Sequence, residues 1–236
     1  MQSRPQNLLI TGASSGVGFE TALHLAEHPE NRVFALARSE QRLQDLRTRS
    51  NGRISTLVFD LTKDKAAGLV TWLNESGVEA LHGLVHNAGF LVNRSFADIT
   101  EAELELSYRT NLMAPFRITQ ALLGHLRAAN GAHVLHISSV GGVQGSVKFP
   151  GLSAYSSSKG ALSVLTECLA CELEPDNIRV NCLALGAVQT EMLNQAFPGY
   201  TAPMGPEEMA KCVAWMLCEG HRYFNGKILP ASISTP

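Results

Sequence analysis

The sequence predicts an α/β fold, a doubly wound parallel sheet of about seven strands flanked by helices. Short apolar segments alternate with longer amphipathic segments along all 236 residues. Most of the apolar segments lack a strict polar–apolar alternation, which is typical of strands covered by helices on both faces. Strands and helices in this order form right-handed crossovers, so the expected strand order is Rossmann-like.

Seven segments are predicted to be strands because they are short, apolar and bounded by turn residues. They are Leu8–Thr11, Arg32–Ala37, Ile54–Phe59, Leu81–His86, His133–Ser138, Ile178–Leu183 and Lys227–Leu229. Helical patterns fill the gaps: Gly16–Glu27, Glu40–Arg49, Lys63–Glu75, Glu101–Ala129, Tyr155–Glu174 and Glu207–Glu219. No linker rich in proline, glycine or serine divides the chain, so residues 1–236 are expected to form a single domain.

Composition excludes several classes of protein. Hydrophobic residues make up 45% of the chain and the net charge is −2, which argues against a disordered chain and against a basic nucleic-acid binder. Cys168 and Cys171 fall within a helical pattern without a second Cys/His pair at ligand spacing. We therefore expect small apolar fillers in a reducing compartment and no metal site.

The start of the chain carries no sign of a targeting segment. Met1 to Gln6 is polar, and the apolar segment that follows already has the length of a strand. No segment approaches the roughly 20 apolar residues of a membrane span. The sequence thus predicts a cytoplasmic protein without membrane contacts.

A glycine-rich loop follows the first strand, at Thr11-Gly12-Ala13-Ser14-Ser15-Gly16-Val17-Gly18. Small residues let the backbone turn sharply and approach a phosphate, and the helix N-terminus then offers unpaired N–H groups and a favourable dipole. We interpret this loop as a pyrophosphate site; the alternative is a turn without a ligand. Its candidate contacts are Gly12, Ser14, Ser15, Gly16, Val17 and Gly18.

The spacing Thr-Gly-x-x-x-Gly-x-Gly resembles that of the short-chain dehydrogenase/reductase family. The resemblance extends over nearly the whole chain, with further motifs in the same order. It implies a Rossmann-fold oxidoreductase of ketone reductase type, which moves a hydride between a nicotinamide and a carbonyl or alcohol carbon. The alternative is a non-catalytic NADP(H)-binding sensor or scaffold of the same fold.

The end of the second strand bears on the choice of dinucleotide. Many NAD sites place a carboxylate here to bind the ribose 2′-hydroxyl, but this chain has Ala37 followed by Arg38 and Ser39. Arg38 can pair with a 2′-phosphate, and Ser39 can add a hydroxyl donor. These residues favour NADP(H) over NAD(H), although an ordinary surface arginine would give the same sequence.

Two further strand ends match the family. By resemblance, Asp60 binds the adenine amino group and Leu61 lines the adenine pocket, while a turn or N-cap role for Asp60 stays open. Asn87-Ala88-Gly89 matches the segment that lines the adenosine side of the cofactor. His86 departs from the family's asparagine, and we expect a structural role for it.

Tyr155 and Lys159 are spaced to share one face of a helix. A free tyrosine has a pKa of about 10 and is a poor base at neutral pH. A neighbouring ammonium, together with a cationic nicotinamide ring, lowers that pKa by favouring the phenolate. Tyr155 is therefore the predicted general acid and base.

The resemblance supplies the rest of the expected catalytic set. Ser139, at the end of the fifth strand, aligns with the family's catalytic serine, which would hold the substrate oxygen where negative charge develops. Ser138 is expected to be a structural neighbour. Asn111 matches the fourth member, which holds a water on the proton path to Lys159; a buried amide that kinks a helix near Pro115 is compatible with this role.

The sixth strand runs into Ala184-Leu185-Gly186-Ala187-Val188-Gln189-Thr190. By resemblance, Val188 and Thr190 contact the nicotinamide carboxamide, although Leu185 replaces the family's proline. The Gln144–Leu152 and Gln189–Tyr200 segments are expected to border a small carbonyl or alcohol substrate. Their candidate lining residues, Phe149, Met192, Phe197 and Tyr200, suggest an apolar or aromatic ketone, but side-chain type alone does not choose the substrate.

The family also predicts a homodimer or homotetramer. Its members pair through the helices that correspond to Glu101–Ala129 and Tyr155–Glu174, both rich in apolar and small residues here. The alternative is that these apolar faces are covered entirely within one subunit.

Overall fold

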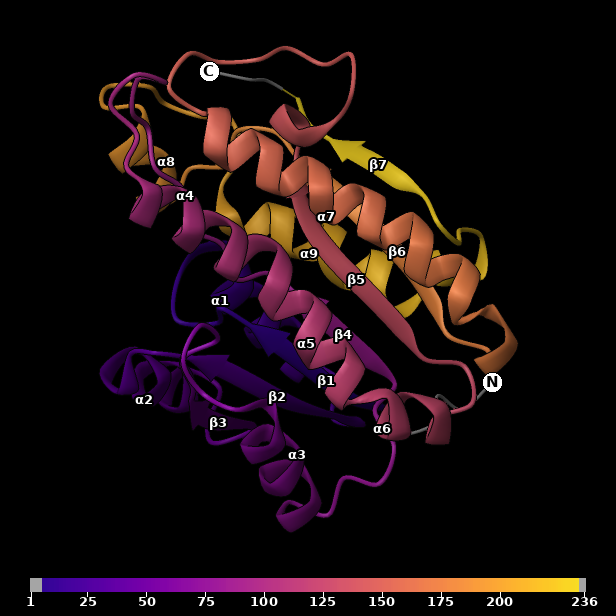
Figure 1. Cartoon of the computed structure of the whole chain (residues 1–236). Coiled ribbons are helices and arrows are strands. Elements are labelled where there is room, and N and C mark those ends of the chain that lie inside the picture. The colour runs from indigo at the N-terminus through magenta and orange to yellow at the C-terminus, as the bar shows by residue number, and fades with distance from the viewer. Residues whose placement is uncertain (1–5, 234–236) are drawn as a thin grey trace.

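The computed structural model describes residues 6–233, which build one parallel sheet of order β3-β2-β1-β4-β5-β6-β7 (Figure 1). Every neighbouring pair is parallel. The strands are β1 (Gln6–Thr11), β2 (Asn31–Ala37), β3 (Ile54–Val58), β4 (Gly83–His86), β5 (His133–Ser139), β6 (Arg179–Leu185) and β7 (Ile228–Ala231). The predicted doubly wound sheet is confirmed, whereas the polar start of the chain lies largely outside the described residues.

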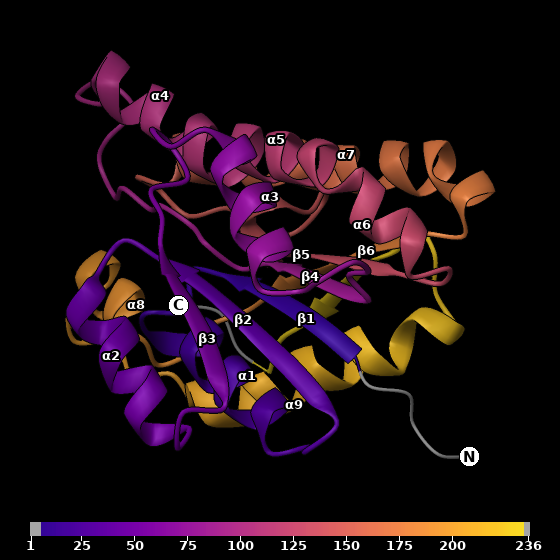
Figure 2. The ribbon, with the colours of Figure 1, turned by 90° about the horizontal axis from the view of Figure 1, so that it is seen from below.

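Helices cover both faces of this sheet, as Figure 2 shows. One layer holds α1 (Gly16–Ala26), α2 (Glu40–Arg49), α8 (Glu191–Ala196) and α9 (Pro206–Cys218). The other holds α3 (Ala66–Glu75), α4 (Glu101–Tyr108), α5 (Ala114–Ala121), α6 (Leu123–Ala128) and α7 (Ser153–Glu172). Successive strand side chains point to opposite faces: Leu8 and Ile10 pack toward α1 and α9, and Leu9 packs toward the second layer.

The expected single helix Glu101–Ala129 is wrong. The chain is helical there, but a π-helix, η1 (Arg109–Met113), separates α4 from α5, and a further break at Leu122 separates α5 from α6. Pro115 follows η1 directly, in the first turn of α5; because proline offers no N–H to the carbonyl four residues before it, it is compatible with the break at η1, whereas it lies too early to explain the break at Leu122.

Two other boundaries differ from expectation. The third helix begins at Ala66 rather than Lys63, because the amides of Lys63 and Asp64 both donate to the carbonyl of Asp60 and form turns first. The short helix α8 lies within Gln189–Tyr200, where the sequence predicts no helix.

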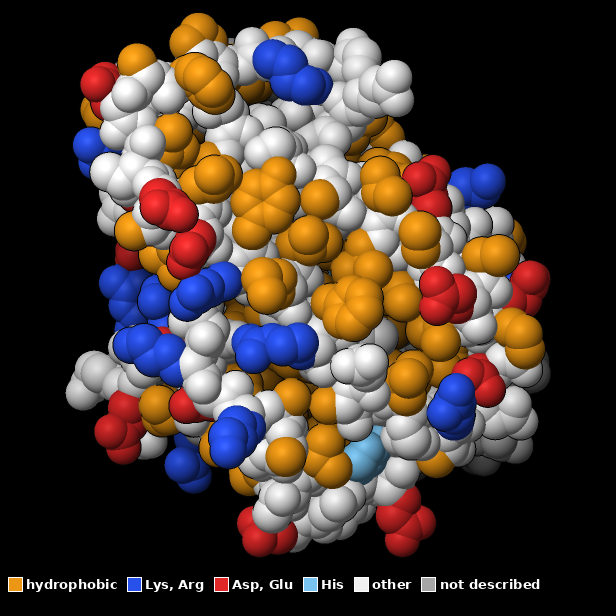
Figure 3. Space-filling model, viewed as in Figure 1, with side chains coloured by type: hydrophobic (Ala, Val, Ile, Leu, Met, Phe, Trp, Pro, Cys, Tyr) orange, Lys and Arg blue, Asp and Glu red, His pale blue; other side chains and the backbone are white. Residues whose placement is uncertain are grey.

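Apolar side chains gather on the outer face of the second layer, over the α4, α5 and α7 region in Figure 3. Leu104, Met113, Phe116 and Val164 are 42%, 50%, 48% and 59% exposed, respectively. These four residues are called the outer apolar face below.

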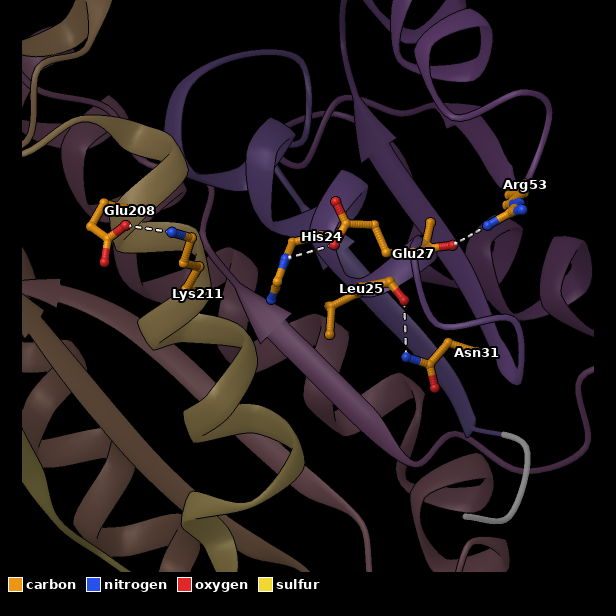
Figure 4. Close-up of polar contacts among 8 residues, drawn as sticks. His24, Leu25, Glu27, Asn31, Arg53, Glu208 and Lys211 are labelled. Carbon is orange, nitrogen blue, oxygen red and sulfur yellow. Dashed lines mark hydrogen bonds and ion pairs between the residues drawn. The ribbon is translucent and has the colours of Figure 1, made fainter. Parts of the chain in front are cut away.

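Side chains from two neighbouring segments close the C-terminal end of α1 (Figure 4). Asn31 Nδ2 donates to the Leu25 carbonyl at 2.9 Å, and Arg53 Nη1 donates to the Ala26 carbonyl at 3.3 Å. These bonds satisfy carbonyls that have no partner within the helix. They fix α1 against the sheet, and its other end carries the glycine-rich loop.

Candidate active site

A cavity of about 960 Å³ lies at the carboxyl edge of the sheet, where the loops after β1, β2, β3, β4, β5 and β6 meet. It runs from Arg38, after β2, to Tyr155 on α7. This edge is where open α/β sheets bind their ligands. Gln144–Leu152 and Gln189–Tyr200, the two segments expected to border the substrate, contribute to its wall through Phe149 and Phe197.

The glycine-rich loop is held from behind by the segment that follows β4. Asn87 Nδ2 donates to the carbonyls of Thr11 and Gly12, each at 3.1 Å, and the Ala88 amide donates to Thr11 Oγ1 at 3.2 Å. Gly12 has a φ of +70°, and a Cβ on it would lie 2.6 Å from the Ala88 Cα. Glycine is thus required for both the conformation and the close approach.

The N-terminus of α1 opens into this cavity. Its N-cap, Ser15, makes no side-chain capping bond, and the first turn contains no acidic residue. A helix end of this kind leaves its N–H groups and its dipole available to an anion. The cradle therefore fits the pyrophosphate of a dinucleotide.

The end of the cavity that follows β2, away from Tyr155, is cationic. Arg38 is exposed there and lines the wall, and Ala37 before it offers no carboxylate. Ser39 accepts a hydrogen bond from the Arg42 amide at 3.4 Å as the N-cap of α2, which leaves its own O–H free to donate.

Asp60 lies across the cavity from Arg38 in a tight turn. Its carboxylate accepts bonds from the Thr62 amide at 2.9 Å and the Thr62 hydroxyl at 2.7 Å. Burial acts to raise the pKa of Asp60, but these bonds and the charges of Lys63 and Arg38 outweigh it and lower the pKa. Asp60 is a turn residue and not the N-cap of α3, which is Lys65.

An ion pair that sequence reasoning missed links two walls of the cavity. Arg42 Nη1 on α2 lies 2.9 Å from Glu191 Oε2 on α8, and both residues line the cavity. They are far apart in the chain, and α8 itself was not predicted, so no local pattern could have paired them.

Tyr155 and Ser139 meet at the inner end of the cavity. The phenol is buried, and the Ser139 side chain is close enough to act on its pKa. Burial raises the pKa of Tyr155 to about 12, and Ser139 acts in the opposite direction. The sequence predicts a lowered pKa for Tyr155, whereas desolvation by the protein raises it in this structure.

Lys159 lies one helical turn after Tyr155 and is also buried. Its Nζ donates to the Ile137 carbonyl at 2.7 Å and lies 5.9 Å from the centre of the Tyr155 ring. Burial lowers the pKa of Lys159 to about 8. Ser138 points elsewhere: its hydroxyl donates to the Lys159 carbonyl at 3.0 Å and supports the backbone of α7.

Asn111 lies in the π-helix and is fully buried. Its Oδ1 accepts from the Phe90 amide at 2.8 Å, while Nδ2 donates to the Phe90 carbonyl and to Ser158 Oγ, each at 2.9 Å. The side chain thus ties the exit of β4 to α7, and both amide hydrogens are used. A π-turn at this place is typical of functional sites.

His86 faces α5 in a buried polar pair with His136. His86 Nε2 lies 2.9 Å from Thr119 Oγ1, His136 Nδ1 lies 2.8 Å from Thr166 Oγ1, and the ring centres are 5.2 Å apart. Burial lowers the pKa of His86 to about 3, so this imidazole is neutral at physiological pH. These contacts describe a structural histidine.

At the end of β6, Thr190 caps α8, its hydroxyl accepting from the Leu193 amide at 3.2 Å. Leu185 pairs with Ala231, and the Gly186 amide donates to the Ala231 carbonyl at 3.0 Å. The turn that carries Val188 to the cavity therefore closes without the family's proline.

Most of the predicted site residues line this one cavity. Gly18 and Asn111 do not. A Cβ on Gly18 would lie 2.1 Å from Asn87 Nδ2, so Gly18 leaves room for the side chain that holds the loop. Asn111 sits behind the wall, where it supports Phe90 and Ser158.

Residues 6–201 match the family described as short chain dehydrogenase. The chain belongs to the short chain dehydrogenase family. Members of this family are oxidoreductases that act on carbonyl and alcohol groups with a nicotinamide cofactor, so the predicted family and its broad chemistry are confirmed.

Individual relatives of this short chain dehydrogenase differ in their substrates. It is 30% identical to a tropinone reductase homologue of Arabidopsis thaliana, over 94% of this chain and 72% of the relative. It is 31% identical to a cyclopentanol dehydrogenase of Comamonas testosteroni, over 80% of this chain and 75% of the relative. The fold matches that of 3-ketoacyl-(acyl-carrier-protein) reductase from Brucella melitensis complexed with NADH, with a TM-score of 0.87, 23% identity and 97% coverage of each chain.

Within residues 6–233 of this short chain dehydrogenase, no three His, Cys, Asp or Glu side chains are grouped so that they could hold a metal ion. Over the same residues, no helix combines the length and apolarity needed to cross a membrane.

Proposed function

We propose that this short chain dehydrogenase is an NADP(H)-dependent ketone reductase in which Tyr155 is the general acid and base. The observation that supports this most is one continuous cavity with an anion cradle at the α1 N-terminus and a buried Tyr155–Ser139 pair at its inner end. A dinucleotide bound along the cavity would supply or accept the hydride at that end.

The proposed chemistry assigns each hydroxyl one task. Tyr155 donates its proton to the carbonyl oxygen of the substrate, and Ser139 donates a hydrogen bond to the same oxygen as negative charge develops. Lys159 holds the cofactor ribose, and its positive charge favours the phenolate that Tyr155 becomes. In the reverse direction, Tyr155 removes the alcohol proton.

Asn111 supports the return of protons from solvent in this proposal. Because both hydrogens of its side-chain amide are engaged, the supporting group is the backbone of the π-turn. Carbonyls in such a turn depart from the regular α-helical bonding and are able to accept from a water.

NADP(H) is proposed over NAD(H) because of the residues at the carboxyl end of β2. Arg38 and the free hydroxyl donor of Ser39 suit a 2′-phosphate, and Ala37 provides no acceptor for a ribose hydroxyl. Asp60 and Leu61 would flank the adenine, and Val188 and Thr190 the carboxamide of the nicotinamide.

The outer apolar face supports a proposed homodimer or homotetramer. Its four residues come from the α4–α5 segment and from α7, and they remain about half exposed in the single chain. Large exposed apolar patches are typical of subunit interfaces. We also propose that residues 1–236 act as one domain and that the protein is cytoplasmic.

The experiment that tests the function is Tyr155→Phe, measured by NADPH binding and by NADPH oxidation with a panel of ketones. Loss of the proton donor is expected to lower turnover about 10²–10⁴-fold while NADPH affinity changes little. Retained turnover would contradict the role of Tyr155. NADPH binding by the wild type without turnover of any ketone would favour the sensor or scaffold.

A further inference from the structure

Two aromatic side chains from distant parts of the chain meet in the wall of the cavity. The rings of Phe149 and Phe197 pack edge to face, with centres 6.1 Å apart and planes at 75°. Phe149 precedes α7, and Phe197 follows α8 directly. Both are half-buried and line the same cavity as Tyr155, so the pair forms part of the wall that a substrate would contact.

A third segment fixes the loops that carry these rings. Asn93 Nδ2 donates to the Ala196 carbonyl at 2.7 Å, next to Phe197. The Arg94 amide donates to the Gly151 carbonyl at 3.0 Å, two residues after Phe149. The two phenylalanines are therefore held in place by adjacent residues of a single segment, which limits the ordering that substrate binding would require.

Many of the other side chains that line the cavity are apolar, among them Phe90, Leu91, Leu152, Met192 and Leu193, and Gln195 and Thr110 are uncharged. Among the described residues that line the cavity, the carboxylates and the cations other than Lys159 are Arg38, Arg42, Asp60, Lys63 and Glu191. The first four follow β2 or β3, and Glu191 is paired with Arg42, so none of them is available beside the phenylalanines.

Lys159 is buried, and its Nζ donates to the Ile137 carbonyl. In the proposed function its remaining donors and its charge serve the cofactor ribose and Tyr155. A carboxylate or phosphate on the substrate would thus lose its water near the two rings without meeting a cation, which is strongly unfavourable. Beyond Gln195, the apolar side chains of this lining offer a polyhydroxy ketone no partners for its hydroxyls.

We propose that Phe149 and Phe197 form an aromatic clamp that selects uncharged ketones whose carbonyl is carried by a small apolar ring. Such a ring stacks on one phenyl face and meets the edge of the other, while its oxygen reaches Tyr155 and Ser139. The clamp rests on the proposed function, because it orients a carbonyl toward Tyr155 as the proton donor.

The test compares three ketones of similar size with NADPH and the full-length protein: cyclohexanone, the polyhydroxy ketone erythrulose and a short 2-keto acid. The wild type is expected to reduce cyclohexanone with a kcat/KM at least about 100-fold above the other two, since a buried polar group without a partner is costly. Phe149→Ala and Phe197→Ala are each expected to raise KM for cyclohexanone about tenfold and to leave kcat within about threefold.

Matched variants separate a clamp from a merely structural role. Phe149→Leu and Phe197→Leu keep apolar bulk and are expected to recover most of the affinity, so they keep the test decisive if an alanine variant fails to fold. Tyr223→Ala removes an aromatic side chain that is 75% exposed and outside the cavity, and it is expected to change no constant. NADPH affinity, measured separately, should be equal in all five variants.

Two outcomes would contradict the clamp, and they can be distinguished from each other. Turnover with a preference for the keto acid or the polyhydroxy ketone, or an unchanged KM in both alanine variants, would overturn the clamp and leave the reductase intact. In the other outcome, the wild type binds NADPH but reduces none of the three ketones and none of a set of larger ketones. That result would overturn the proposed reductase function, and the clamp with it.

Discussion

At the residue scale, the site depends on a few side chains whose surroundings the sequence did not reveal. Tyr155 and Lys159 are both buried, which raises the pKa of the phenol to about 12 and lowers that of the ammonium to about 8. The spacing of four residues predicted that they share a helix face. Their burial depends on the packing of α7 against β5, which local sequence does not encode.

Arg38→Ala tests the choice of dinucleotide at this scale. The guanidinium would contribute a charge-assisted contact to a 2′-phosphate that NADH lacks, and such contacts are worth about 1.5–3 kcal/mol. We expect NADPH affinity to fall about 10–100-fold in a fluorescence titration while NADH affinity stays nearly constant.

The control is Arg222→Ala, which removes a surface arginine that pairs with Glu219 outside the cavity. It should leave both affinities unchanged. An equal loss of NADPH and NADH affinity in Arg38→Ala would contradict the assignment of NADP(H).

At the scale of elements, the carboxyl ends of parallel strands bring the site together. Most predicted residues reached one cavity because each motif followed a strand, and parallel strands end at the same edge. The exceptions depend on tertiary contacts. Gly18 leaves room for the Asn87 side chain. In the π-turn, Asn111 bonds to Phe90 and Ser158, which are distant in the chain.

The prediction of the fold succeeded for the same reason. It failed at elements whose structure depends on tertiary contacts or that are very short. Strand and helix patterns located all seven strands, because the five inner strands are short, buried apolar segments and the two edge strands, β3 and β7, are bounded by turn residues. The π-turn leaves no pattern in a continuous amphipathic segment, and the six residues of α8 are too few to show a helical period. The aromatic pair at 149 and 197 required both loops in three dimensions.

Gly18→Ala tests the coupling between the glycine-rich loop and β4. A Cβ there would lie 2.1 Å from Asn87 Nδ2 and 2.6 Å from the Gly12 carbonyl oxygen, so Asn87 must move and release the loop. The expected result is at least a tenfold loss of NADPH affinity, on the order of 1.4 kcal/mol or more, by calorimetric titration.

Gly68→Ala is the matched control. Gly68 lies within α3, and a Cβ on it would meet nothing within 4 Å. The substitution should stabilise the protein by about 0.5–1 kcal/mol and leave NADPH affinity unchanged. Unimpaired NADPH binding by Gly18→Ala would show that the loop does not depend on Asn87.

At the scale of the whole molecule, burial lowers the pKa of three histidines in the described part of the chain far below its usual value. Burial lowers the pKa of His86 and of His133 to about 3, and lowers that of His136 well below 6.5. In the unfolded chain each takes up a proton near pH 6.5. The folded state does not, so their contribution to stability is complete above about pH 6.5 and is lost progressively toward about pH 3.

This predicts a stability that falls steeply with acid. Each histidine adds about 1.4 kcal/mol per pH unit to the slope of the unfolding free energy below about pH 6. Urea unfolding at about pH 7 and about pH 5 measures the slope, and His86→Gln should reduce it by one histidine's share. A free energy of unfolding that is constant over this range would show that these histidines are not buried as described.

The outer apolar face predicts self-association at the same scale. Phe116→Glu places a charge at its centre, and a buried charge without a partner strongly opposes assembly. Sedimentation velocity is expected to show a dimer or tetramer for the wild type and mostly monomer for the variant. Trp215→Glu places the same charge on α9, in the opposite layer, and is the control for a second interface on that side. A monomeric wild type would mean that the face is not a subunit contact.

The most direct measurement is the transfer of deuterium from NADPH, labelled at its transferable position, to a cyclic ketone, followed by mass spectrometry of the alcohol. Our account predicts one deuterium on the carbinol carbon with the wild type and about 10²–10⁴-fold slower labelling with Tyr155→Phe. Labelled NADPH that binds the wild type but gives no labelled alcohol, or equal rates for the two proteins, would contradict it.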